Sequence, residues 1–446
     1  MSVSADPSST SWIDRDAAVV WHGFTQMSAY AGNAPIIVDR AQGRELIAVD
    51  GRRYLDAISS LWVTTLGHHV PELDAAVRDQ LDKVAHSTML GNGNTVTIEL
   101  AEALAPRVPV DQPHFLFASD GAAAVEQALK IAFQFWSNQG VSGRTRYLAL
   151  GGAYHGDTIG AISLGAGGFG TDVFDPLRFS ALRAPGYDDP AWADGAVALI
   201  EAHAHELAAM VLEPLVQGAA GMQITDPASV GRVVEAAQRH DVLVIVDEVA
   251  TGFGRTGTLF ASEQCGIRGD LLCIGKGISG GYLPLAATVA SGRVFDAFLG
   301  PDLSERTFYH GHSYSGNGLA CAVALRHLEL VDEWDVLANV RARAAQLDAL
   351  LTERVAALAA VAAVRQRGLM TGVELAPPAD GLRWGRRVCA GAVERGVLLR
   401  PLGDVVVLMP MLTCTAGEID RIVTVLIEAI DEVGTTGTDA PGGAPA

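Results

Sequence analysis

The segment "DVLVIVDEVATGFGRTG" (residues 241–257) joins an uninterrupted apolar run to two acids and a glycine-rich loop. Such a run, apolar on both faces, is typical of a strand buried inside a parallel sheet. Asp247 stands where this strand should end, and functional groups of open α/β sheets collect at the carboxyl ends of the strands. An aspartate at that place is also a common helix N-cap, so a functional role and a capping role both stay open for Asp247.

Similar short apolar runs lie on both sides of this segment, separated by stretches with the 3.6-residue period of helices, such as 121–135 and 228–240. This alternation predicts an α/β fold with a mainly parallel central sheet. The predicted strands are "FLFAS" (115–119), "RYLAL" (146–150), "AAMVLEPL" (208–215), "LLCIGK" (271–276) and "LAATVAS" (285–291).

The two ends of the chain have a different pattern of predicted strands and helices. Residues 35–60 read as a β-meander with turns at "QG" and "DG", residues 317–358 as a long helical region, and residues 361–410 as strands around a further helix. We therefore expect a smaller α/β domain built from both ends. The predicted division is a disordered N-terminus (1–12), a segment contributing to the small domain (13–75), a large cofactor-binding domain (76–330), a C-terminal small domain (331–433) and a disordered tail (434–446).

Composition limits the possible partners and the compartment. The 446 residues carry a net charge of −19, which repels nucleic acids and anionic membranes. No apolar stretch is long enough to span a membrane, and the amino-terminal residues do not resemble a secretion signal. The five cysteines are scattered without metal-like spacing, so we expect a soluble cytoplasmic protein with no metal site.

Lys276 lies between two glycines at the end of a predicted strand, where a carbonyl carbon could reach it. A single lysine in a glycine-rich loop is usually just solvated, but together with Asp247 it meets the needs of pyridoxal phosphate. The lysine would hold the aldehyde as a Schiff base, and the carboxylate would keep the ring nitrogen protonated. The pair therefore predicts a pyridoxal-phosphate enzyme.

Two further segments fit such a cofactor. In "FASDGAAAVEQALK" (117–130), Gly121 and Ala122 begin a predicted helix, whose free N–H groups and dipole favour a phosphate. In "GGAYHGDT" (151–158), the Tyr154 ring could stack on a pyridine ring, although ordinary packing is the commoner role for a tyrosine. His155 has no second ligand in view and does not predict a metal site.

These motifs, in this order and spacing, resemble those of the class III (ω) aminotransferases, pyridoxal-phosphate enzymes of fold type I. The resemblance extends from about residue 20 to about residue 410. It implies a large domain with a mainly parallel sheet, a smaller α/β domain from the two chain ends, and a homodimer with shared active sites. The motifs are "SDGAAAVE" (119–126), "AYHGDT" (153–158), "EPLVQGAAGM" (213–222), "VDEVATGFGRTG" (246–257), "GKGISGG" (275–281) and "YHGHSYSGN" (309–317).

The resemblance also implies roles for individual residues. Lys276, Asp247 and Tyr154 resemble the Schiff-base lysine, the partner of the ring nitrogen and the stacking ring. Gly121 and Ala122 resemble the phosphate-binding turn, with Ala122 in place of a hydroxyl residue, and Ser313 resembles a phosphate ligand from the second subunit. The substrate-lining residues implied in the same way are Phe24, Trp62, Asp157, Arg255, Gly311 and Arg400, with Arg400 meeting a substrate carboxylate.

Within the family the chain is most similar to the branch that aminates 8-amino-7-oxononanoate during biotin synthesis. Phe24, Leu61 and Val407 replace aromatic residues that users of S-adenosylmethionine as amino donor usually carry, so the resemblance leans toward lysine as donor. An ω-aminotransferase that passes amines to pyruvate remains an alternative. An isomerase or decarboxylase on the same fold would share Lys276 and Asp247, and a non-catalytic binding protein would need neither.

Overall fold

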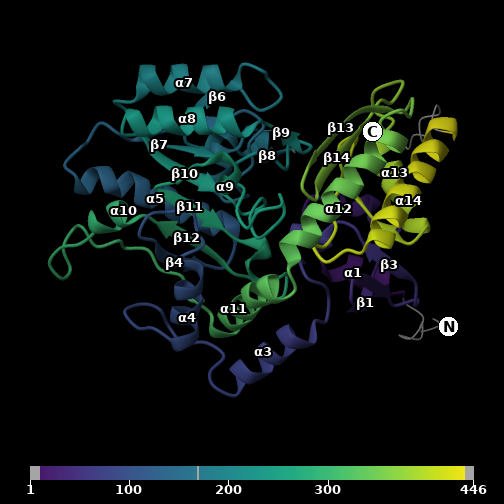
Figure 1. The fold of residues 1–446 in the computed structure, drawn as a ribbon, viewed down its shortest axis with the longest axis horizontal. Helices are drawn as coiled ribbons and strands as arrows, with labels where there is room; N and C mark the ends of the chain where they lie inside the picture. The colour runs from purple at the N-terminus through teal and green to yellow at the C-terminus, as the bar shows by residue number, and fades with distance from the viewer. Residues whose placement is uncertain (1–10, 168–169, 437–446) are drawn as a thin grey trace, which may run out of the picture.

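The computed structural model describes residues 11–167 and 170–436, and its larger part is built on a seven-stranded sheet (Figure 1). The strand order is β4-β12-β11-β10-β7-β5-β6, and every pairing is parallel except the two made by β12. The strands are β4 (His114–Ala118), β5 (Arg146–Leu150), β6 (Leu182–Ala184), β7 (Leu207–Leu212), β10 (Leu243–Asp247), β11 (Leu271–Ile274) and β12 (Ala286–Ala290).

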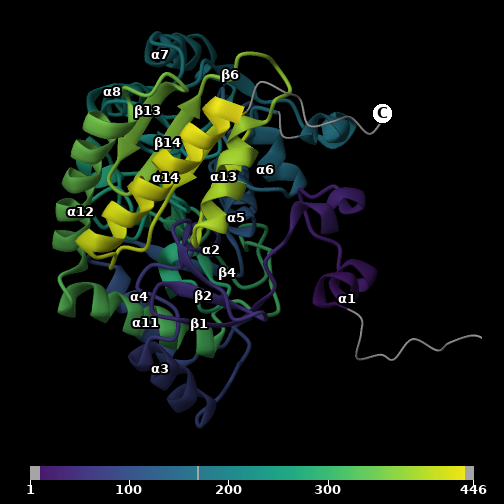
Figure 2. The same ribbon diagram turned by 90° about the vertical axis from the view of Figure 1, so that its right-hand side faces the viewer.

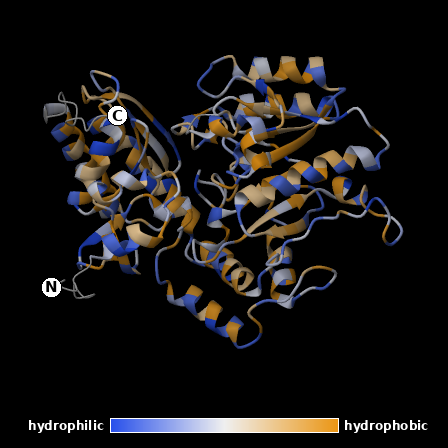
Figure 3. Cartoon of the chain, turned by 180° about the vertical axis from the view of Figure 1, so that it is seen from behind, coloured by the Kyte–Doolittle hydropathy of each residue, from blue (hydrophilic) through white to orange (hydrophobic). Residues whose placement is uncertain are grey.

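The predicted strands are confirmed, and the mainly parallel sheet follows from their composition. All residues of β7, β10, β11 and β12 are buried, because helices cover both faces of the sheet. Figure 3 shows the resulting concentration of apolar residues in the strands. The edge strand β6 was not predicted, since it has only three residues and only one of them is buried.

Helices pack on the two faces of this sheet and bury a separate apolar cluster on each. The helix α5 starts at Gly121 as predicted, because Asp120 caps it by accepting the Ala123 N–H at 2.9 Å. The helices and short turns of this part are α3 (Pro71–Leu81), α4 (Thr95–Leu104), α5 (Gly121–Asn138), α6 (Ile159–Leu164), η4 (Thr171–Leu177), α7 (Trp192–His203), α8 (Pro227–Arg239), α9 (Ser262–Cys265), η5 (Lys276–Ser279) and α10 (Gly292–Asp296), with the small hairpin β8 (Val216–Gln217) and β9 (Gln223–Ile224).

The smaller part combines both ends of the chain, as predicted. The amino-terminal meander β1 (Val38–Gln42), β2 (Glu45–Ala48) and β3 (Arg53–Asp56) is extended by the parallel pairing of β3 with β15 (Val397–Leu398). Figures 1 and 2 show these amino-terminal strands beside the C-terminal elements. Those elements are β13 (Val361–Arg367), β14 (Met370–Leu375), α13 (Trp384–Glu394), β16 (Arg400–Leu402), β17 (Val405–Leu408) and α14 (Ala416–Thr436).

The expected helical region 317–358 is broken into α11 (Gly318–Glu333), α12 (Val336–Leu350) and a π-helical turn, Leu351–Val355. Asp335, with φ of +46°, interrupts it. Residues of α11 belong to the cores of both parts, for example Cys321 to the large one and Val331 to the small one. The domain boundaries at residues 75/76 and 330/331 therefore stay a prediction.

The ends of the described chain are more ordered than expected. Ser11 caps the helix α1 (Trp12–Val19), which precedes the turns η2 (Met27–Ala29) and η3 (Ala31–Asn33). The helix α14 continues through residues 434–436, so this part of the predicted disordered tail is helical. Residues 1–10 and 437–446 lie outside the described part. No helix within 11–167 and 170–436 is long and apolar enough to cross a membrane.

Candidate active site

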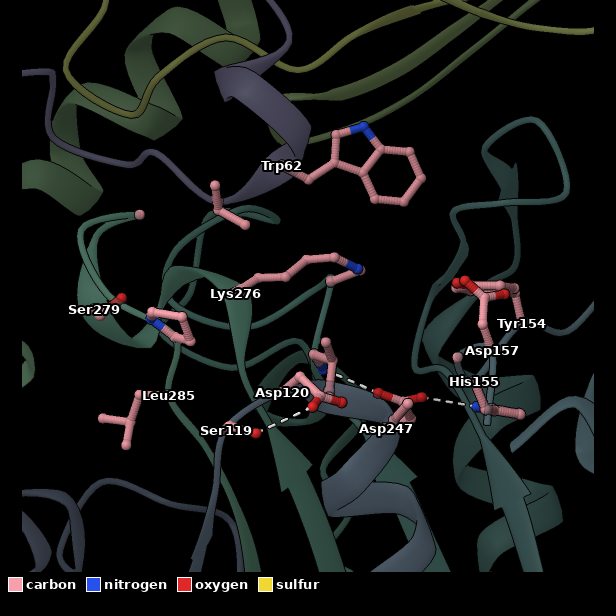
Figure 4. A pocket seen from close by; sticks show the side chains of 18 of the residues that line it. Trp62, Ser119, Asp120, Tyr154, His155, Asp157, Asp247, Lys276, Ser279 and Leu285 are labelled. Atoms are coloured by element: carbon pink, nitrogen blue, oxygen red, sulfur yellow. Dashed lines mark hydrogen bonds and ion pairs between the residues drawn. The ribbon is translucent and has the colours of Figure 1, made fainter. Parts of the chain in front are cut away.

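A cavity of about 700 Å³ lies at the carboxyl edge of the central sheet (Figure 4). Its walls come from strand ends, from the start of α5 and from the short α2 (Ser59–Trp62) of the amino-terminal segment. The structure brings seven of the expected site residues together there: Trp62, Gly121, Ala122, Tyr154, Asp157, Asp247 and Lys276.

Asp247 is the last residue of β10 and is 4% exposed. It does not cap a helix, because a glycine-rich loop follows it. Its Oδ1 accepts the Val249 N–H at 3.0 Å, and its Oδ2 lies 2.7 Å from Nδ1 of the buried His155. Desolvation, the largest single influence, lowers the pKa of His155, but the hydrogen bond and charge of Asp247, with the charge of Glu213, outweigh it and raise this pKa.

Lys276 follows β11 by two residues and begins the turn η5 with a φ of +42°. Its neighbour Gly277 is closely packed, since a Cβ there would lie 3.0 Å from Cβ of Phe253. The Lys276 Nζ lies 5.0 Å from the centre of the Trp62 ring. Burial lowers the pKa of Lys276, against the opposing charges of Asp247 and Glu213, which favours the neutral, nucleophilic amine.

The side chains of Lys276 and Asp247 point into the same cavity (Figure 4). The start of α5 forms its floor beside them. A Cβ at Gly121 would lie only 2.6 Å from Cγ1 of Val249, and a Cβ at Gly156 only 2.4 Å from Cβ of Ala122. The backbone at the start of the helix is thus open on one side and tightly packed on the other, as a phosphate cradle requires.

Glu213 is a cavity residue that sequence reasoning did not select. It follows β7 directly and is 5% exposed, and its carboxylate accepts the N–H groups of Tyr154 at 3.2 Å and Gly218 at 3.3 Å. Burial raises the pKa of Glu213 to about 7. The signal was available, because Glu213 is an acid at a strand end like Asp247. Burial also raises the pKa of Tyr154, and the charge and hydrogen bond of Asp157 raise it further.

The model of the family "Aminotransferase class-III" matches residues 26–430.

The chain is a class III aminotransferase.

A relative from Nitratidesulfovibrio vulgaris, an adenosylmethionine-8-amino-7-oxononanoate aminotransferase, is 45% identical over 95% of this chain and 82% of its own length. The crystal structure of the enzyme of the same name from Methanocaldococcus jannaschii has a TM-score of 0.91 at 38% identity, covering 94% of this chain and 98% of that one. An amine transaminase from an uncultivated Pseudomonas species, solved in its PLP-bound form, has a TM-score of 0.86 at 33% identity, covering 92% and 98%.

As a class III aminotransferase, the enzyme depends on pyridoxal phosphate. The residues present fit this cofactor. One cavity is surrounded by a partly buried lysine with a lowered pKa, a buried carboxylate, an aromatic ring and an open helix start. No cluster of histidines, cysteines and acids that could hold a metal ion occurs among residues 11–167 and 170–436.

Five expected site residues of the aminotransferase do not line this cavity: Phe24, Arg255, Gly311, Ser313 and Arg400. Arg255 is 1% exposed and donates to the backbone carbonyls of Pro410 at 2.7 Å and Thr64 at 3.2 Å, so it braces two chain segments instead. The other four are exposed on the single chain, and the backbone carbonyl of Ser313 accepts a hydrogen bond from Nε2 of His86.

Proposed function

We propose that this aminotransferase converts 8-amino-7-oxononanoate to 7,8-diaminononanoate in biotin synthesis. The observation that carries the proposal is the set of nearly full-length relatives. Those from five organisms, 37–45% identical to the chain, are all adenosylmethionine-8-amino-7-oxononanoate aminotransferases. Full-length likeness at this level supports a shared substrate more strongly than the fold does, because one fold hosts many functions.

The bound cofactor supplies an aldehyde and an electron-withdrawing ring. We propose that Lys276 would hold the aldehyde as a Schiff base and, as a free amine, would move the proton at the substrate's reacting carbon, first as base and then as acid. Asp247, held by His155, would keep the ring nitrogen protonated. Tyr154 would stack on the ring, and the N–H groups of Gly121 and Ala122 would bind the phosphate.

The residues that we propose for substrate binding lie partly in the cavity and partly on the exposed surface of the chain. Trp62 and Asp157 line the cavity and are proposed to contact the substrate. Arg400 would bind the far carboxylate of the oxononanoate, with Phe24 and Gly311 also contributing. We propose a homodimer in which a second copy supplies Ser313 to the phosphate. The buried position of Arg255 supports a bracing role better than a substrate contact.

A direct assay tests this proposal. Purified enzyme is given 8-amino-7-oxononanoate with either S-adenosylmethionine or lysine, and the diamine is measured by mass spectrometry. Diamine formation with either donor supports the function and identifies the donor. The relatives' names favour S-adenosylmethionine, whereas Phe24, Leu61 and Val407 favour lysine, so the two donors are compared at equal concentration. Absence of diamine with both donors would refute the proposed acceptor.

A second candidate is an amine transaminase acting on pyruvate, favoured by the 33% identity to a solved amine transaminase. Its reaction would use the same Lys276 and Asp247. The same enzyme preparation with pyruvate and a simple amine, such as 1-phenylethylamine, separates the two functions, because only this candidate forms alanine rapidly and no diamine.

A further inference from the structure

The chain between β3 and the cavity makes an unusual turn. Ser59, Ser60 and Trp62 have φ values of +52°, +60° and +65°, a region that L-residues other than glycine seldom adopt. Three such residues within four positions need neighbours that hold them there. The turn ends in Trp62, whose ring forms one wall of the cavity beside Lys276 (Figure 4).

A single buried carboxylate binds this turn. Asp56, the last residue of β3, is 1% exposed. Its two oxygens accept the Ser60 N–H at 2.9 and 2.8 Å, and its Oδ2 also accepts the Ser60 hydroxyl at 3.0 Å. Nε2 of His68 lies 3.0 Å from the same Oδ2 and donates to it, because a carboxylate only accepts. The Ile58 N–H adds a longer bond of 3.4 Å.

Other bonds tie the same segment to the small domain. The Ser59 hydroxyl donates to the Met409 carbonyl at 2.7 Å, and the Met409 N–H donates to the Ala57 carbonyl at 2.8 Å. The guanidinium of Arg255 donates to the carbonyl of Thr64 just beyond the turn. Among the residues that the structure describes, Asp56 is therefore the one side chain that binds the backbone of the turn itself, within a segment fixed at both ends.

Trp62 in turn has little freedom. It is 7% exposed and packs in an apolar cluster with Met222, Met370 and Met409. Gly218 closes the other side, since a Cβ there would lie 3.1 Å from Cζ3 of the Trp62 ring. A change in the backbone angles at Ser60 would rotate the following residues, and the ring would lose this fit and its place beside Lys276.

We infer that Asp56 is a positioning residue for substrate binding: its carboxylate holds the left-handed turn at Ser59 and Ser60, and thereby sets the Trp62 ring as the cavity wall beside Lys276. Asp56 touches no reacting atom. The inference rests on the proposed function only for the choice of acceptor. Asp56 affects how well the substrate binds in the cavity, and not the attachment of the cofactor to Lys276.

The test replaces Asp56 by asparagine in the full-length holoenzyme. The amide keeps the shape but turns one acceptor into a donor that faces Ser60 or His68. We expect the KM for the acceptor ketone to rise about tenfold while kcat stays within about threefold, as for a change in ground-state binding. The visible absorbance of the lysine-bound cofactor should stay as in the wild type.

Asp270→Asn is the matched control. Asp270 is also largely buried and accepts a backbone N–H, that of Val244 at 2.9 Å, but at the opposite edge of the sheet. The Asp270→Asn variant should have a lower free energy of unfolding but an unchanged KM for the acceptor. In the Asp56→Asn background, Ser60→Gly should bring the raised KM most of the way back to the wild-type value, because glycine adopts a φ of +60° without help from a carboxylate. A merely destabilised fold would not be rescued by glycine.

The inference is overturned if folded Asp56→Asn keeps KM within twofold of the wild type, or if adding Ser60→Gly leaves the raised KM of Asp56→Asn unchanged. Should Asp56→Asn not fold, Ser60→Ala, which removes only the hydroxyl bond, takes its place with an expected rise in KM of about threefold, and an unchanged KM then overturns the inference. Turnover of oxononanoate by the wild type tests the proposed function separately. The variants are compared with whichever acceptor, oxononanoate or pyruvate, the wild type uses.

Discussion

Nδ1 of His155 lies 2.7 Å from Oδ2 of Asp247, and the two side chains are 0% and 5% exposed. Because the carboxylate accepts, Nδ1 carries the proton of this bond. Nε2 of His155 has no hydrogen-bond partner in the part of the chain that the structure describes. Among the described residues, His155 therefore bonds to Asp247 alone. It holds Oδ2, while Oδ1 accepts the N–H of Val249 in the loop that lines the cavity.

His155→Gln should show what this pair contributes. The pKa of His155 is raised above its usual 6.5, so its stabilising effect is fully present below pH 6.5 and is lost as the pH rises through the higher folded value. We expect the variant's loss in unfolding free energy, measured with urea, to be larger at pH 6 than at pH 9. His203→Gln, which breaks a partly exposed surface pair with Glu206, is the control and should show little change at either pH. Equal losses at both pH values for His155→Gln would argue against a charged pair.

Lys276→Ala should abolish transamination. The amine is the group that bonds to the cofactor and moves the proton, and loss of such a group lowers kcat by at least about 100-fold. The visible absorbance of the lysine-bound cofactor should disappear as well. Lys130→Ala is the control, because Lys130 lies on the exposed face of α5 and lines no part of the cavity. Retention of both turnover and absorbance by Lys276→Ala would rule out its assigned role.

The sequence predicted the central sheet well because its strands are buried on both faces and therefore read as continuous apolar runs. It also selected Lys276 and Asp247, which the structure places in one cavity, because both stand at strand ends: Lys276 lies between two glycines, and Asp247 precedes a glycine-rich loop. The role of Asp56 could not be predicted, because it depends on backbone angles at Ser59 and Ser60 that nothing in "ISSLW" signals. The resemblance implies a substrate contact for Arg255, but its bonds to the carbonyls of Pro410 and Thr64 depend on the fold and cannot be seen in the sequence.

Glu213→Gln should change how stability depends on pH. In the unfolded chain Glu213 loses its proton near 4.5, but in the fold only near 7, so the fold loses stability as pH rises between these values. The shift corresponds to about 3 kcal/mol, since each pKa unit is worth about 1.4 kcal/mol. Glutamine has no such proton to lose. Between pH 5 and pH 8, the cofactor-free wild type should therefore lose more unfolding free energy in urea than the variant, and parallel pH curves would contradict a raised pKa for Glu213.

Arg255→Lys separates bracing from substrate binding. The buried guanidinium makes two bonds to carbonyls in different segments, and the charge of Asp56 favours it, whereas burial lowers the pKa of Arg255 to about 10. A lysine cannot span both carbonyls with the same fork, and its ammonium is more strongly hydrated. We expect a loss of about 2–4 kcal/mol in unfolding free energy, the range for breaking a buried polar network. The KM for the acceptor should change only indirectly, when movement of the Thr64 segment displaces the Trp62 ring. If Arg255 instead met the substrate, the variant would keep its stability and lose affinity for the acceptor, so urea unfolding and KM measured on one preparation distinguish the two roles.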